Sequence, residues 1–121
     1  MRKVISIVLR LVAAFIMLQT LYFKFTAQPE SVYIFSTIGV EPWGRIGTGI
    51  AELVASILLL IPRTMVLGAV MAIGIMLGAI ATHLFILGIQ VQGDGGQLFA
   101  YALTVLTASI ALLILRKTET A

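Results

Sequence analysis

The sequence has no cysteine, three prolines, one histidine and few charged residues. Without cysteine the chain cannot form its own disulfides, thiol relays, iron–sulfur clusters or Cys-ligated metal sites. A length of 121 residues would ordinarily give one small soluble domain, but 60% of the residues are apolar and only 11% are charged. Because a small domain has a large surface relative to its core, so few charges cannot keep that surface in water. We therefore expect lipid to contact most of the outside.

Four long apolar runs account for the hydrophobicity, at residues 4–23, 44–61, 65–89 and 97–115. Each run is about 18 to 25 residues long, enough to cross a hydrocarbon core of about 30 Å as a helix. In lipid, only a helix satisfies its backbone hydrogen bonds within a single segment. The runs therefore predict an all-α fold, a single domain over residues 1–121 that is an integral membrane bundle of four transmembrane helices. The first run is too long for a secretory signal, and we expect it to be retained.

The positions of lysine and arginine predict the orientation of the bundle. One side has five of them and the other has two, namely Arg2, Lys3, Arg63, Arg116 and Lys117 against Lys24 and Arg45. By the positive-inside rule, both termini are expected to face the cytoplasm. Residues 24–43 then form an outer loop, in which Pro29 and the acid after it are typical of a helix start. We expect a short helix there, lying in the membrane interface or over the bundle.

Ionisable residues collect toward the outer end of the predicted bundle. Such groups are costly at membrane depth and usually face the bundle interior or a water-filled cavity. At about 100° per residue, Glu52 shares one stripe of the second run with Arg45, Gly49 and Ser56. A similar stripe on the fourth run holds Gln97, Tyr101 and Thr104. We predict an outward-facing polar pocket, a candidate proton relay, from five residues: Lys24, Arg45, Glu52, His83 and Asp94.

Each of these residues also has a purely structural interpretation. Glu52 would then be a buried carboxylate paired with Arg45 or Lys24, and these two bases would anchor their helices at the interface. His83 would orient its helix, and no metal is expected because a single histidine is weak evidence for one. Asp94 would be a loop residue, since the glycine-rich turn around it follows no strand and is no phosphate loop.

Two further patterns bear on partners. Gly74, Gly78 and Thr82 form a ridge of small residues, expected to let a neighbouring helix approach closely within the chain or in a homo-oligomer. No nucleic-acid binding is expected, because the basic residues are divided between the two faces of the membrane.

Several segments resemble a known family. The segments are Tyr22–Phe25, Gly44–Gly47, Ala51–Leu53, Gly74–Ile80, Thr82-His83 and Gly93–Gly96. Together they resemble the DoxX family of small four-helix bacterial inner-membrane proteins, over essentially the whole chain. Lys24 after the first helix and Glu52 in the second are the most characteristic pair. The resemblance implies a multi-pass protein of the bacterial inner (cytoplasmic) membrane, related to terminal-oxidase, thiosulfate:quinone or thiol and superoxide stress systems.

Three functions remain open at this point. The first is a subunit or accessory of a membrane redox or respiratory system, with a redox partner subunit and a pocket that binds a quinone while Glu52 and His83 relay protons. The second is a proton-coupled transporter of small solutes. The third is a non-catalytic assembly or anchoring protein. No catalytic motif is complete within the chain, so whether it is an enzyme stays open, and a quinone is the one candidate cofactor.

Overall fold

The computed structural model describes residues 2–26, 29–41, 43–89 and 96–120, and all regular elements in these ranges are helical. Seven elements follow one another along the chain: α1 (Arg2–Phe25), α2 (Pro29–Thr37), α3 (Trp43–Leu60), η1 (Pro62–Thr64), α4 (Met65–Thr82), η2 (His83–Leu87) and α5 (Gln97–Thr120). Four segments are long and apolar enough to cross a membrane, at Lys3–Phe25, Trp43–Leu60, Pro62–Leu87 and Gln97–Arg116. The all-helical bundle with four candidate spans is as the sequence predicts.

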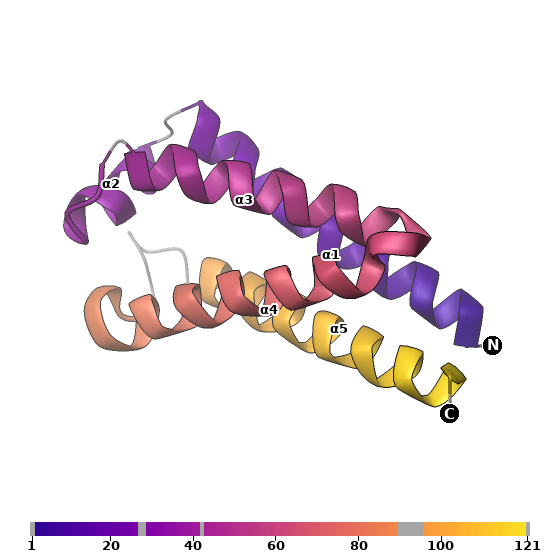
Figure 1. Cartoon of the computed structure of the whole chain (residues 1–121). Coiled ribbons are helices and arrows are strands. Elements are labelled where there is room, and N and C mark those ends of the chain that lie inside the picture. The colour runs from indigo at the N-terminus through magenta and orange to yellow at the C-terminus, as the bar shows by residue number, and fades with distance from the viewer. Residues whose placement is uncertain (1, 27–28, 42, 90–95, 121) are drawn as a thin grey trace.

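The four long helices form a ring in which α1 contacts α3, α3 contacts α4, α4 contacts α5, and α5 contacts α1. A tight 3-10 turn, η1, joins α3 to α4, and Thr64 Oγ1 donates a hydrogen bond to Leu58 O at 2.9 Å. Both termini lie at the same end of the bundle as this turn, and α2 lies at the other end (Figure 1). We call this other end the α2 end.

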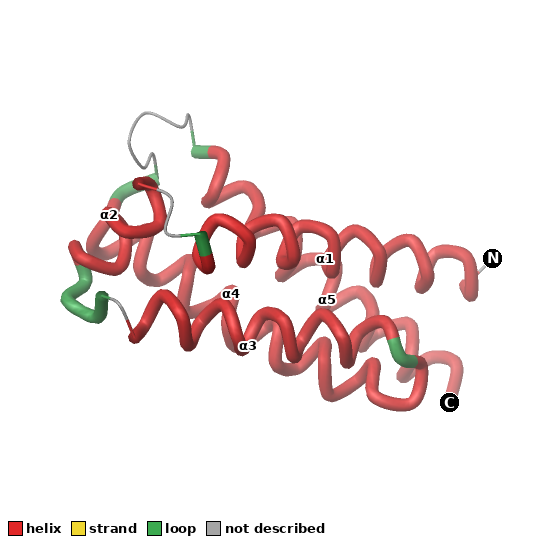
Figure 2. The backbone as a smooth tube through the Cα atoms, turned by 90° about the horizontal axis from the view of Figure 1, so that it is seen from above, coloured by secondary structure: helices red, strands yellow, loops and turns green. Residues whose placement is uncertain are grey.

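The bundle is narrow near η1 and wider at the α2 end. Gly68 on α4 lies so close to α3 that a Cβ there would be 2.6 Å from Leu59 N. Figure 1 shows α3 and α4 separating from this contact toward the α2 end, and Figure 2 shows the same bundle from above. The backbones of α3 and α4 are therefore further apart at the α2 end than near η1.

The core where the four helices meet is built mainly from alanine and methionine, namely Ala13, Met17, Ala55, Met65, Ala69, Ala72, Met76, Ala102 and Ala108, and is completed by Leu59, Val105 and Leu112. Small residues let helices pack closely in lipid, where packing rather than the hydrophobic effect drives helix association. Large apolar side chains such as Phe15, Phe85 and Ile114 lie exposed on the outside instead. Large apolar side chains on the outside and small ones in the core are the distribution expected for a bundle that faces lipid.

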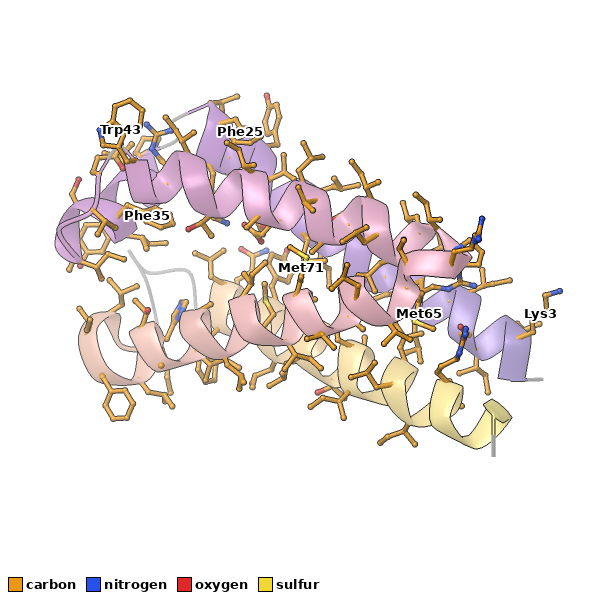
Figure 3. The ribbon with its side chains drawn as sticks, in the orientation of Figure 1. Lys3, Phe25, Phe35, Trp43, Met65 and Met71 are labelled. Carbon is orange, nitrogen blue, oxygen red and sulfur yellow. The ribbon has the colours of Figure 1, made fainter. Side chains whose placement is uncertain are left out.

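The segment between α1 and α3 contains α2, a short helix of nine residues that begins at Pro29. It packs against both α1 and α3. Phe35 on α2 is buried, whereas Trp43 at the start of α3 points away from the bundle and is 78% exposed (Figure 3). Gly39, at a φ of 79°, ends α2 in a conformation that favours glycine. The short helix that the sequence predicts in this segment is therefore present.

The run expected as one helix over residues 65–89 consists of two elements. After α4 the backbone widens into the π turn η2, which begins at His83. Gly88 closes the turn, because its N–H donates to His83 O at 2.6 Å while its φ is 83°. Turns of this kind are frequent at functional sites, because they displace the side chains from regular helical positions.

Candidate functional site

A cavity of about 860 Å³ lies inside the bundle at the α2 end. Its walls come from all four long helices, and Pro29, Ile34 and Phe35 of α2 line it as well, together with Ile38 in the turn that follows α2. Most lining residues are apolar or glycine, and the polar ones are Gln19, Thr20, Lys24, Thr48, Glu52, Thr82, His83, Gln97 and Tyr101. Small-molecule sites usually measure about 300–1,000 Å³ and have this mixture of apolar walls and few polar groups.

The first polar group of the cavity is an ion pair between α1 and α3. Lys24 Nζ lies 2.6 Å from Glu52 Oε1, and Thr20 Oγ1 donates a hydrogen bond to Glu52 Oε2 at 3.1 Å. Glu52 is 2% exposed, so its charge depends on these partners. Oε1 is paired with Lys24 by charge and has no hydrogen-bond partner among the described residues, so this carboxylate oxygen can still accept a hydrogen bond.

Helical periodicity explains how α3 presents this carboxylate. The buried residues of α3 include Arg45, Gly49, Glu52 and Ser56, the four residues that share one predicted stripe. Ser56 Oγ donates back to Glu52 O at 2.8 Å, which satisfies a buried hydroxyl within the same helix. Gly49 lets the Phe25 ring pack directly on the α3 backbone, because a Cβ there would lie 2.7 Å from Phe25 Cε1. This packing fixes the end of α1, where Lys24 lies, against α3.

The second polar group is His83, which lines the cavity from the α4 side and is 6% exposed. Its Nδ1 lies 2.8 Å from Ala79 O. Because a carbonyl oxygen can only accept, Nδ1 has the proton in this contact, and in the neutral ring Nε2 is then an acceptor. Within the described residues Nε2 is buried without a hydrogen-bond partner. The ring packs against Phe99 in a T-shaped arrangement, with centroids 5.6 Å apart.

Arg45 does not line the cavity. Its Nε donates to both oxygens of Glu41, at 2.8 and 3.1 Å, and its Nη1 donates to the carbonyl oxygen of Lys24. That carbonyl belongs to the last turn of α1, where helix carbonyls lack partners within the helix. Arg45 therefore fastens the end of α1 to the start of α3, and sequence reasoning missed Glu41 as its partner.

The structure thus brings together three of the five residues proposed from the sequence. Lys24, Glu52 and His83 line one cavity, while Arg45 lies beside it and Asp94 lies outside the described residues. No cluster of three or more His, Asp or Glu side chains suited to a metal ion occurs in the described part of the chain.

Helix α5 meets the cavity differently from the predicted stripe. Gln97 and Tyr101 line the cavity, and Gln97 Nε2 donates to Tyr101 Oη at 2.7 Å. Thr104 is exposed instead, and its hydroxyl donates to Ala100 O at 2.8 Å. Ala102 and Val105 are the buried residues at this level. The predicted stripe is rotated around the helix axis by about one residue from the face that is buried. Few polar residues on α5 mark the buried face.

The ridge of small residues on α4 also differs from expectation. Gly74 and Gly78 line the cavity, and a Cβ at either would meet no atom within 4 Å. The prediction that they bring a neighbouring helix of the chain close is therefore wrong, and Gly68 makes that contact instead. The spacing of small residues identifies a smooth helix face but does not say what lies against it.

These observations define a class: a multi-pass membrane protein whose four-helix bundle contains a largely apolar cavity with a Lys–Glu pair in its wall. A family model described as the DoxX-like family matches residues 8–112, and the chain belongs to this family. The match extends from α1 into α5 and includes Lys24, Glu52 and His83. Comparison with curated proteins and with solved structures gives no match.

Proposed function

We propose that this protein binds a quinone in the cavity at the α2 end, as a subunit or accessory of a membrane redox system. One observation supports the proposal above the others: a cavity of ligand size places the Lys24–Glu52 pair and the unpartnered Nε2 of His83 around an apolar interior. A quinone head group has an apolar ring between two carbonyl oxygens, which need hydrogen-bond donors. The cavity offers an apolar space for the ring and polar side chains for the carbonyl oxygens.

The proposed binding assigns a task to each polar residue. The Lys24 ammonium has three N–H donors, so it can remain paired with Glu52 and still donate a hydrogen bond to one quinone carbonyl oxygen. His83 Nε2 accepts a hydrogen bond from a quinol hydroxyl when neutral and donates to a quinone oxygen when protonated. Glu52 accepts from the quinol on the other side. Electrons would come from a redox partner subunit, while these residues hold the head group and exchange its protons.

The proposal includes an orientation. Lys3, Arg63 and Arg116 belong to the end of the bundle that holds the termini and the η1 turn, opposite the α2 end (Figure 1). The positive-inside rule then favours a bacterial inner membrane with this end in the cytoplasm. The cavity would open toward the outer leaflet, and α2 would lie at the outer interface as its cover.

A fluorescence titration tests the quinone site. Trp43 is the single tryptophan of the chain, and quinones quench tryptophan emission. For protein in lipid nanodiscs, we expect saturable quenching by a decyl-tailed para-benzoquinone, with weaker binding in Glu52→Gln and His83→Asn. Thr104→Ala is the matched control, because Thr104 is polar and exposed but does not line the cavity.

Non-saturating quenching that is the same in all four proteins would contradict quinone binding. If such protein also purified with a stoichiometric partner, and the Glu52 and His83 variants assembled normally, a role in assembly would replace the redox proposal. Solute uptake into proteoliposomes that requires a pH gradient would favour transport.

A further inference from the structure

The cavity is bordered by glycine on two adjacent helices. Gly47 on α3 and Gly74 and Gly78 on α4 line the cavity, and all three are also exposed. A Cβ at any of these positions would meet no atom within 4 Å. At these points the wall between the cavity and the outside has no side chain.

The fold explains why the wall is thin between α3 and α4. The η1 turn and the contact of Gly68 with Leu59 hold the two helices together at the opposite end. From there they separate toward the α2 end (Figure 1). We call the region around Gly47, Gly74 and Gly78 the α3–α4 seam.

The depth of the seam indicates what it faces. Gly74 lies midway along the candidate span Pro62–Leu87, and Gly78 lies one helical turn further toward the α2 end. Leu77 and Ala81, which flank Gly78 on the outer face of α4, are exposed and do not line the cavity. The α4 side of the seam is therefore at the depth of the hydrocarbon core, whereas Gly47 on the α3 side lies one helical turn after the start of the candidate span Trp43–Leu60.

We propose that the α3–α4 seam is a lateral portal through which the ligand of the cavity enters from the bilayer, and that this ligand is an amphiphile with a long apolar tail. The head group reaches Lys24, Glu52 and His83, while the tail lies between the glycines and extends into lipid. The inference rests on the proposed function for the head group and adds the class of ligand and its route.

A smooth helix face alone would not identify a ligand site. The independent evidence is His83, which directly follows Thr82 at the end of the glycine ridge and lines the same cavity. It is nine-tenths buried, and its Nε2 has no partner among the described residues. Leaving a buried polar atom unpaired costs free energy, so a ligand atom at this position would remove that cost.

A pair of variants separates the portal from the head-group site. Gly78→Phe places a bulky side chain in the seam, whereas Ala81→Phe places the same side chain on the exposed face of α4 one turn away. In the Trp43 titration, Gly78→Phe should raise the Kd of the decyl-tailed para-benzoquinone about tenfold, equivalent to about 1.4 kcal/mol. The Kd of the same quinone without its tail should stay within about twofold, and Ala81→Phe should change neither value.

Equal weakening of both quinones by Gly78→Phe, or no weakening of the tailed one, would overturn the portal. If the unmodified protein bound neither quinone, the proposed function would fail instead. In that case, a measurement that needs no ligand tests whether the α3–α4 seam is open to lipid.

That measurement uses the absence of cysteine, which allows single spin labels. In nanodiscs, a nitroxide at Gly78→Cys should be as accessible to dissolved oxygen as one at Ala81→Cys, and both should be protected from a water-soluble nickel relaxant. Several-fold lower oxygen access at position 78 than at position 81 would show a seam closed by packing and would overturn the portal whatever the ligand.

Discussion

Lys24 Nζ and Glu52 Oε1 lie 2.6 Å apart and connect the last turn of α1 to the middle of α3. Only 3% of the Glu52 side chain and 15% of the Lys24 side chain are exposed. Removing two charges from water is costly, and their attraction offsets this cost only while both are present. The contribution of each charge to the stability of the fold therefore depends on the presence of the other.

This coupling predicts the outcome of a double-mutant cycle. Lys24→Met and Glu52→Gln should each lower the free energy of unfolding by about 3 kcal/mol, because each leaves a buried charge without its partner. The double variant should lose clearly less than the sum of the two. Unfolding by detergent titration measures all three. Additive losses would show that the two charges do not stabilise one another.

The glycines of α4 make a second prediction about stability. Gly78→Ala should raise the free energy of unfolding by up to about 1 kcal/mol, because alanine favours the helix and its Cβ has open space. Gly68→Ala should lower it, since its Cβ would lie 2.6 Å from Leu59 N and push α4 away from α3. The same unfolding titration compares them. Changes of the same sign in both variants would contradict the assigned environments.

The sequence predicts the helices well because its signals are strong and local. Length and hydropathy define the four candidate spans, and Pro29 marks the start of α2. The stripe on α3 is also readable, because Glu52 and Arg45 are conspicuous in an apolar segment. In lipid, a buried face must contain such groups, so their spacing alone orients the helix.

The remaining features depend on how helices pack, which spacing cannot show. Arg45 and Glu52 share a stripe on α3, yet they do not pair with each other. Arg45 pairs with Glu41, four residues earlier in the chain, and Glu52 pairs with Lys24 of α1. Gly68 and Gly78 are equivalent residues in one helix, but the divergence of α3 and α4 puts one in contact and the other in the cavity wall. The π turn at His83 likewise has no signal beyond Gly88.

Arg45 provides the third prediction, because it lies beside the cavity without lining it. Arg45→Gln should lower the free energy of unfolding by about 2 kcal/mol, through loss of charged hydrogen bonds to Glu41 and to the end of α1. The Kd of the tailed quinone should stay within about twofold of the unmodified protein, measured where the variant is fully folded. Arg45→Lys should recover only part of the stability, since an ammonium lacks the planar fork of donors. A large loss of quinone affinity in folded Arg45→Gln would place Arg45 in the binding site after all.

His83 provides the fourth prediction, which separates its two ring nitrogens. Asparagine at position 83 can still donate to Ala79 O through its amide, but it has no group at the place of Nε2. His83→Asn should therefore unfold at nearly the same detergent concentration as the unmodified protein. Its Kd for the tailed quinone should rise by up to about tenfold, the effect of one hydrogen bond of about 1.4 kcal/mol.

Two further variants show whether Nε2 itself is responsible for that loss. His83→Gln extends the amide toward the position of Nε2 and should restore part of the affinity, whereas Phe99→Leu removes the ring packed on His83 and keeps the imidazole. If Phe99→Leu weakened binding as much as His83→Asn while His83→Gln restored nothing, the role of His83 would be to pack against Phe99. Recovery in His83→Gln alone identifies the buried Nε2 as the atom that meets the ligand.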